Sequence, residues 1–221
     1  MSQIVLVEGS IAAGKSTLLQ SLNDKFHGDV YTFSEPVDLW RAWKSEASGA
    51  TYNFLEKSYK EKKTFSFPFQ VFVLASYLEK FKEAYADFQL SGKRFFMMER
   101  SIITTTYVFA KLLRRQQSLS QEEFEILDYL TTQLVEEIPK FSQVDVVFYI
   151  RLSPQECHRR IQLRGRSEED QISMDYLKNL HELYEDWLAH GFAPLAPKRV
   201  IVLDGTQGKA KLKGEVNRML G

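Results

Sequence analysis

The stretch Gly9-Ser10-Ile11-Ala12-Ala13-Gly14-Lys15-Ser16 decides the fold of this chain. It matches the phosphate-binding pattern G-x-x-x-x-G-K-[ST], in which glycines let backbone N–H groups turn toward phosphate oxygens. The pattern follows the apolar run Ile4–Val7 and precedes residues spaced along one helix face: Leu18, Leu19, Leu22 and Phe26. A strand, a loop and a helix whose positive end faces the same anion are therefore predicted. The alternative is a glycine-rich turn with an unrelated lysine.

In this pattern Lys15 reaches the β- and γ-phosphates, and the Ser16 hydroxyl is a ligand of Mg²⁺. The loop thus predicts a bound nucleoside triphosphate but leaves open which molecule receives the phosphoryl group.

Composition narrows the class of protein. The 221 residues favour one domain, 1–221, and 29 basic residues balance 29 acidic ones, so we expect neither nucleic acid nor a membrane as partner. The one cysteine, Cys157, fits a buried apolar position in a reducing compartment. Because the first strand begins close to Met1, we expect no secretory or mitochondrial presequence and a cytoplasmic location, with a viral or bacterial source also possible.

Five short runs are almost wholly apolar, which is typical of parallel strands buried on both faces by helices. They are Ile4–Val7, Val30–Phe33, Phe95–Met98, Val144–Ile150 and Val200–Leu203. The segments between them have helical spacing, so the sequence predicts an α/β protein with a five-stranded parallel sheet.

Helix boundaries are readable in several places. An aromatic stripe from Phe69 to Phe88 has Pro68 near its start and Gly92 after its end; most of it is expected in the core, and the rest could line a pocket. Capping boxes begin helices at Ser120 and Ser153. A later helix from about Leu177 is expected to end at Gly191, and the mixed-charge run 60–63 reads as a solvated helix face.

Charged side chains follow each predicted strand, where open parallel sheets bind their ligands. After the phosphate loop these are Ser34-Glu35-Pro36, Glu99-Arg100-Ser101, the arginines Arg159, Arg160, Arg164 and Arg166, and Asp204-Gly205. Phosphoryl transfer needs cations on the migrating group, a metal between the phosphates and a group that takes the acceptor's proton.

Glu35 is the candidate base, since Pro36 keeps it out of helical geometry; capping the next helix is the alternative. Glu99 could hold Mg²⁺ through water, and Arg100 could clamp Glu35 or a phosphate oxygen, unless the two form a structural ion pair.

Arg160 and Arg164 share a helix face, and Gly165 ends that helix, which frees Arg166–Asp170 to act as a lid (about 164–171). Arginines there can neutralise the phosphoryl group and stack on adenine. A solvated basic helix end is the alternative. No Asn-Lys-x-Asp motif of guanine recognition is present.

Together these residues resemble the deoxynucleoside kinase family, which includes deoxycytidine, deoxyguanosine and mitochondrial thymidine kinases and insect multisubstrate kinases. The resemblance covers about residues 3–190 and is carried by five motifs: the loop at 9–17, Glu-Pro-Val at 35–37 with Trp40, Phe-Gln at 69–70, Glu-Arg-Ser at 99–101 and Leu-Arg-Gly-Arg-x-Glu-Glu at 163–169. It implies a homodimeric P-loop kinase that uses ATP and Mg²⁺ to phosphorylate the 5′-hydroxyl of a deoxynucleoside in nucleotide salvage.

The resemblance also implies residue roles. Glu35 is the base, Arg100 holds Glu35 and the 5′ end, and Gln70 pairs with the base edge. Trp40, Phe69 and Phe109 enclose the base, with Thr105 beside it, and Tyr59 and Glu169 bind the 3′-hydroxyl. The phosphates fall to residues 9–17 (Gly9, Ser10, Ile11, Ala12, Ala13, Gly14, Lys15, Ser16, Thr17) and to the lid-region arginines Arg160, Arg164 and Arg166, and the metal falls to Ser16 and Glu99.

Two positions depart from the family pattern. Tyr77 and Thr105 stand where relatives that handle purines and cytosine have an arginine and an aspartate, which favours pyrimidines, thymidine first and deoxycytidine second. The segment 204–208 lacks an aromatic residue that some relatives have there, so the range of donors beyond ATP stays open.

Two other functions remain possible at this stage. A thymidylate kinase typically has Asp-Arg after the third strand, where this chain has Glu99-Arg100, and has less need of a base at Glu35. A nucleotide-dependent switch would not need an acceptor-side set such as Glu35, Gln70 and Arg100.

Overall fold

A five-stranded parallel sheet with order β2-β5-β1-β6-β7 forms the centre of the computed structural model, which describes residues 2–23, 28–138, 143–189 and 197–220. The strands are β1 Gln3–Glu8, β2 Val30–Phe33, β5 Phe95–Glu99, β6 Val146–Arg151 and β7 Arg199–Asp204. The predicted α/β fold and its sheet are confirmed. Phe26 and Gly191, which were expected to belong to flanking helices, lie outside the described residues.

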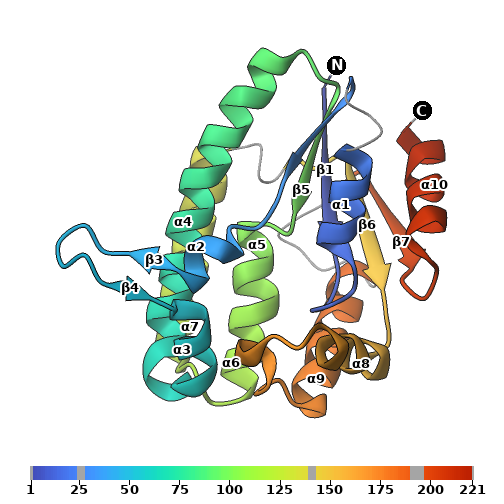
Figure 1. Cartoon of the computed structure of the whole chain (residues 1–221). Coiled ribbons are helices and arrows are strands. Elements are labelled where there is room, and N and C mark those ends of the chain that lie inside the picture. The colour runs from blue at the N-terminus through green and yellow to red at the C-terminus, as the bar shows by residue number, and fades with distance from the viewer. Residues whose placement is uncertain (1, 24–27, 139–142, 190–196, 221) are drawn as a thin grey trace.

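Helices connect the strands and pack around the sheet (Figure 1). The longer ones are α1 Lys15–Asn23, α4 Lys62–Ser91, α7 Gln121–Glu137, α8 Pro154–Arg164, α9 Met174–Tyr184 and α10 Lys209–Leu220. Shorter helical segments are α2 Val37–Arg41, α3 Phe54–Lys60, α5 Ile102–Thr104, the π-helix Thr105–Ala110, α6 Lys111–Arg115, the 3₁₀ turn Ser167–Glu169 and the π-helical end Glu185–Ala189. None of the described helices is long and apolar enough to cross a membrane.

The central strands are fully buried because helices cover both of their faces. Residues 5–7 of β1 and residues 96–98 of β5 have no exposed surface. The edge strand β7 differs from the expectation of burial on both faces, because Val200 and Val202 are 36% and 47% exposed while Ile201 and Leu203 face the core. The edge strand therefore alternates as a half-covered strand does.

The aromatic stripe of α4 is mostly core, as expected. Phe81 and Phe88 pack on Phe96 of β5 with ring centroids 5.7 and 5.1 Å apart, and Phe33 of β2 meets Tyr77 edge-on at 5.0 Å. The helix begins six residues before Pro68, at Lys62, and ends at Gly92 in the left-handed conformation that favours glycine. Helix α4 thus packs against β2 and β5 and also extends beyond the carboxyl ends of these strands.

Two local expectations were wrong, and one element was not anticipated. The run 60–63 is no continuous helix face, because Glu61 has ψ +50° and separates α3 from α4. Strand β6 starts at Val146 rather than Val144, because the Asp145 carboxylate accepts the Ile4 N–H at 2.9 Å and takes the place of a strand carbonyl. The antiparallel pair β3 Trp43–Lys44 and β4 Thr51–Tyr52, which projects beside α2 and α3 in Figure 1, was not anticipated.

Candidate active site

The phosphate loop has the backbone that its glycines predict. Gly9 has φ +148°, and a Cβ there would lie 2.7 Å from the Ile150 carbonyl oxygen, while Gly14 has φ +105°. Lys15 begins α1, and its Nζ donates to the carbonyls of Gly9 and Ser10 at 3.0 and 2.9 Å. Burial, with the Arg100 charge, lowers the pKa of Lys15 to about 8. The charged form of Lys15 is therefore less favourable than in water, and a phosphate bound beside it would stabilise that charge.

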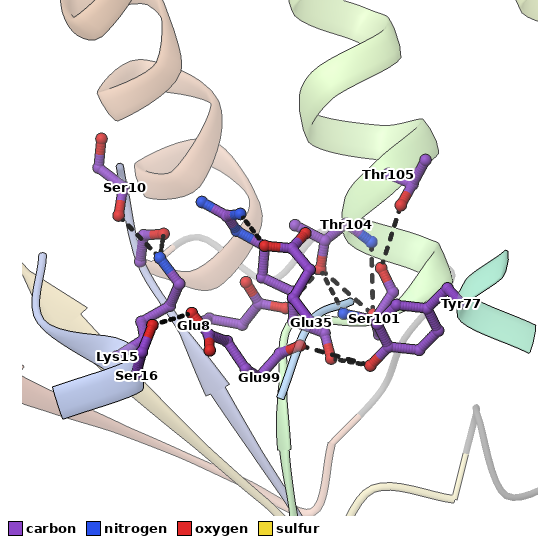
Figure 2. A network of polar contacts seen from close by, with 12 residues as sticks. Glu8, Ser10, Lys15, Ser16, Glu35, Tyr77, Glu99, Ser101, Thr104 and Thr105 are labelled. Carbon is purple, nitrogen blue, oxygen red and sulfur yellow. Dashed lines mark hydrogen bonds and ion pairs between the residues drawn. The ribbon is translucent and has the colours of Figure 1, made fainter. Parts of the chain in front are cut away.

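Three charged residues from the ends of two strands, Glu35 after β2 and Glu99 and Arg100 at the end of β5, meet beside this loop, and Figure 2 shows Glu35 and Glu99 there. Arg100 Nη1 lies 2.5 Å from Glu35 Oε2, and both side chains are about one-tenth exposed (11% and 10%). Ser16 Oγ donates to Glu99 Oε1 at 2.9 Å. Burial raises the pKa of Glu35, the Arg100 charge lowers it, and Glu99 raises it, with burial the largest effect. A carboxylate held in this way is a stronger base than a solvated glutamate.

A cleft of about 590 Å³ opens above the loop. Its walls are the loop residues Ile11 to Leu18, Glu35, Glu99 and Arg100, the three lid-region arginines Arg160, Arg164 and Arg166, and the turn Thr206–Lys209. Gly9 and Ser10 lie below the cleft and do not line it. Arg160 joins two of the walls, donating to the Gly205 carbonyl at 2.8 Å and to the Ala13 carbonyl at 3.4 Å.

The segment expected to be a lid is anchored by ion pairs in this structure. Gly165 ends α8 with φ +62°, as expected. Arg164 Nη2 is 2.5 Å from Glu169 Oε1, and Arg166 Nη1 is 3.6 Å from the same oxygen. Glu168, which is 5% exposed, pairs with Arg41 Nε of α2 at 2.8 Å. The lid-region cations therefore share a carboxylate that was expected to bind the sugar.

A second, smaller pocket of about 90 Å³ adjoins the cleft on the helical side. Trp40, Phe69, Gln70, Thr105 and Phe109 line it, as the resemblance implies, and Leu55, Ser66 and Tyr176 were not anticipated. Glu35, Arg100, Trp40 and Tyr59 line both cavities. Gln70 Oε1 and Ser66 Oγ are buried without a hydrogen-bond partner among the described residues.

Comparison with known proteins agrees with this geometry. The family model for deoxynucleoside kinases matches residues 5–219. The chain belongs to the deoxynucleoside kinase family. It is therefore an ATP-dependent phosphotransferase, and nucleotide salvage is the role of its family.

Several curated relatives of the kinase are about 30% identical to it over the aligned residues. It is 30% identical to mitochondrial deoxyguanosine kinase of Xenopus laevis, over 82% of this chain and 71% of that protein. The identity is 30% to mitochondrial thymidine kinase 2 of Homo sapiens (91% and 71%) and 31% to deoxycytidine kinase of Mus musculus (84% and 75%). Because these names differ in the base, the comparison leaves base preference open.

Of the two positions in the kinase that depart from the family pattern, one lies at the smaller pocket and one does not. Thr105 lines the smaller pocket, whereas Tyr77 lines neither cavity and turns its hydroxyl to the Arg100 carbonyl at 2.7 Å. The sequence analysis used Tyr77 and Thr105 together to argue base preference, and of the two only Thr105 lines the pocket. Helix α4 is rotated so that Gln70 and Val73 face the pocket and Tyr77 faces the strand end.

Sequence reasoning missed Glu8, the last residue of β1. Its carboxylate is fully buried, accepts a hydrogen bond from Thr104 Oγ1 and accepts another from Tyr184 Oη at 3.2 Å. Burial raises the pKa of Glu8 to about 7, although both hydrogen bonds and the charges of Arg100 and Lys15 lower it. A charged residue directly before the loop could have drawn attention, but its partners lie about 100 residues away or more.

Glu8→Gln is expected to change how stability depends on pH. The folded-state pKa of about 7 exceeds the ordinary value of 4.5, so the folded protein binds the extra proton between these values and loses stability as pH rises through them. Between these two pKa values the free energy of unfolding falls by roughly 3 kcal/mol, and the glutamine variant lacks this loss because it cannot titrate. Relative to the parent, its melting temperature should therefore rise from pH 5 to pH 8.

Thermal melts across this range, at fixed ionic strength, measure the difference. Glu46→Gln, an exposed carboxylate between β3 and β4, is the matched control. Because the pKa of Lys15 is lowered to about 8, its titration begins at the upper end of this range, so the comparison is read between pH 5 and 7. Parallel curves for the parent and Glu8→Gln would contradict the prediction.

Proposed function

We propose that the kinase transfers the γ-phosphoryl group of ATP to the 5′-hydroxyl of a deoxynucleoside, with Glu35 as the base. The observation that carries this proposal is the position of Glu35, which lines both the phosphate cleft and the smaller pocket. A nucleoside in the smaller pocket would present its sugar alcohol where the two cavities join. The triphosphate would lie in the larger cleft, with its γ-phosphoryl group toward the same point.

In the proposed reaction the 5′-oxygen forms a bond to the γ-phosphorus while the bond to the bridging β,γ-oxygen breaks. The hydroxyl proton passes to Glu35 and ADP leaves. Arg100, 2.5 Å from Glu35, keeps the carboxylate aimed and supplies positive charge beside the transferring group. Lys15 and the lid-region arginines neutralise the charge that spreads over the phosphoryl oxygens in the loose transition state.

The site also fits Mg²⁺, which ATP-dependent kinases require. Ser16 Oγ and Glu99 Oε1 are 2.9 Å apart at the base of the cleft. They are hard oxygen donors of the kind this ion prefers, and Mg²⁺ in such sites takes few protein ligands and keeps several waters. When bound, the ion would neutralise charge on the phosphate oxygens, and Ser16 would hold it directly while Glu99 would hold it through water.

The preferred acceptor is a pyrimidine deoxynucleoside, thymidine before deoxycytidine. This preference rests on positions 77 and 105, which hold Tyr77 and Thr105 in place of an arginine and an aspartate. Gln70 Oε1 is buried in the smaller pocket with no hydrogen-bond partner in the described part of the chain, and a side-chain amide can meet a base N–H and a base oxygen together. Neither Thr105 nor Val73 brings a charge to the pocket wall.

Initial rates with ATP and Mg²⁺ on the four natural deoxynucleosides and on thymidine monophosphate test the proposal. We expect thymidine to have the highest kcat/KM, deoxycytidine the next, and thymidine monophosphate no measurable turnover. Phosphorylation of the monophosphate alone would identify a thymidylate kinase instead. ATP binding without transfer to any acceptor would identify a nucleotide-dependent switch.

The homodimer implied by the resemblance is part of the proposal. Ile126 and Tyr129, one helical turn apart on α7, are 49% and 64% exposed, which supports an interface on that helix. The expected cytoplasmic location also stays a prediction, and two of the relatives named above are mitochondrial.

A further inference from the structure

Arg100 adopts a backbone conformation that is costly for a side-chain-bearing residue. Its φ is +58°, in the left-handed region that residues other than glycine rarely enter. Its N–H still donates to the Val7 carbonyl at 3.1 Å, as if β5 continued, and then the chain turns away. This turn directs the Arg100 side chain over the cleft. Because the left-handed conformation is unfavourable, other contacts have to stabilise it.

The residues after the turn are held by a capping box. Thr104 N–H donates to Ser101 Oγ at 3.3 Å and Ser101 N–H donates to Thr104 Oγ1 at 3.2 Å, which fixes the start of α5. Thr104 Oγ1 also donates to the buried Glu8 carboxylate. These bonds position residues 101–104, but none of them reaches the Arg100 carbonyl.

Tyr77 supplies the bond to that carbonyl (Figure 2). Its hydroxyl donates to the backbone carbonyl oxygen of Arg100 at 2.7 Å and lies 3.4 Å from the backbone carbonyl oxygen of Glu99. The side chain is 1% exposed, and its ring lies edge-on to Phe33 at 5.0 Å. Burial raises the pKa of Tyr77 well above its ordinary value, so the hydroxyl is a proton donor at all working pH values.

The other end of Arg100 is equally well placed. The guanidinium lies over the Phe109 ring, 4.7 Å from its centroid, and pairs with Glu35 at 2.5 Å. A connected path therefore runs from the Tyr77 hydroxyl through the Arg100 backbone to the Glu35 carboxylate. We propose that Tyr77 is a positioning residue that fixes the left-handed turn at Arg100 and so aims the guanidinium at the base.

This inference rests on the proposed role of Glu35, and Tyr77→Phe tests it because only the hydroxyl is lost while the ring stays in the core. We expect kcat to fall roughly 5–10-fold, the factor of one buried hydrogen bond, with the nucleoside KM changed less than about twofold. The acid limb of the pH profile should move to higher pH, because a loosened Arg100 lowers the pKa of Glu35 less than before.

Tyr85→Phe is the matched control. It lies two turns further along α4 with its ring 5.4 Å from Phe96, and it should leave kcat and the pH profile unchanged. A double-mutant cycle with Arg100→Met isolates the path, because Tyr77→Phe should have no further effect once the guanidinium is gone. Equal losses in both backgrounds would overturn the proposal, as would an unchanged kcat and acid limb in the single variant.

A readout apart from turnover separates this inference from the proposed function. Carbon-13 NMR of labelled glutamate carboxyls, assigned with Glu35→Gln, gives the pKa of Glu35 directly. A higher value in Tyr77→Phe than in the parent is expected even if Glu35 proves not to be the base. An identical value in both proteins would refute the positioning role while leaving the proposed reaction standing.

Discussion

Lys15→Ala is expected to lower kcat by at least about 1,000-fold, because it removes a full charge from the position that the loop pattern assigns to the β- and γ-phosphates. The fold should persist. Burial lowers the pKa of Lys15 to about 8, which means that the folded protein disfavours this charge, and alanine relieves that cost. Single-turnover transfer from ATP labelled at its γ-phosphate, together with a thermal melt, measures both properties.

Lys82→Ala, an exposed lysine on α4, is the control for this experiment. Near-parental transfer by Lys15→Ala would show that the loop does not hold the triphosphate. If the alanine variant proves unfolded, Lys15→Met restores the buried volume and allows the same measurement.

Glu35→Gln should lower kcat at least about 100-fold, since glutamine cannot accept the proton of the 5′-hydroxyl. In the parent, Arg100 lies 2.5 Å from Glu35, and the amide oxygen of the glutamine can still accept a hydrogen bond from it. The pocket should therefore keep its shape, and the nucleoside KM should change little. Comparing kcat and KM for the preferred deoxynucleoside measures this separation.

The same variant carries a pH prediction. Burial raises the pKa of Glu35, so the parent should lose activity as pH falls through a value above the ordinary 4.5, because protonation removes the base. The residual activity of Glu35→Gln should lack this limb. Turnover close to that of the parent, or an unchanged acid limb, would remove Glu35 as the base.

Much of the fold could be predicted from the sequence because its determinants are local. A glycine loop between an apolar run and a helical pattern fixes the first strand, the loop and α1 together. The parallel-sheet rule then gathers Glu35, Glu99 and Arg100 at one edge, where the structure places them. Their catalytic and binding roles remain predictions, whereas their proximity is an observation.

Other features depend on contacts between distant residues and were out of reach. The direction of Tyr77 depends on the rotation of α4 against β2 and β5, which a helical stripe alone does not define. The role of Glu8 depends on Thr104 and Tyr184, which come from two other helices. The positive φ of Arg100 leaves no trace in the sequence, because arginine gives no hint of a left-handed turn.

The two glycines that meet the end of β6 bear on how ADP and the product leave. A Cβ on Gly9 would meet the Ile150 oxygen at 2.7 Å, and one on Gly205 would meet the Arg151 oxygen at 2.8 Å, so backbone lies against backbone at both points. Arg160 braces the same two loops from above. The wall of the cleft that is formed by the phosphate loop and the turn after β7 is therefore fixed to the sheet. We therefore expect any opening movement of the cleft to occur on the helical side, and the release rate of ADP and product to respond to changes there.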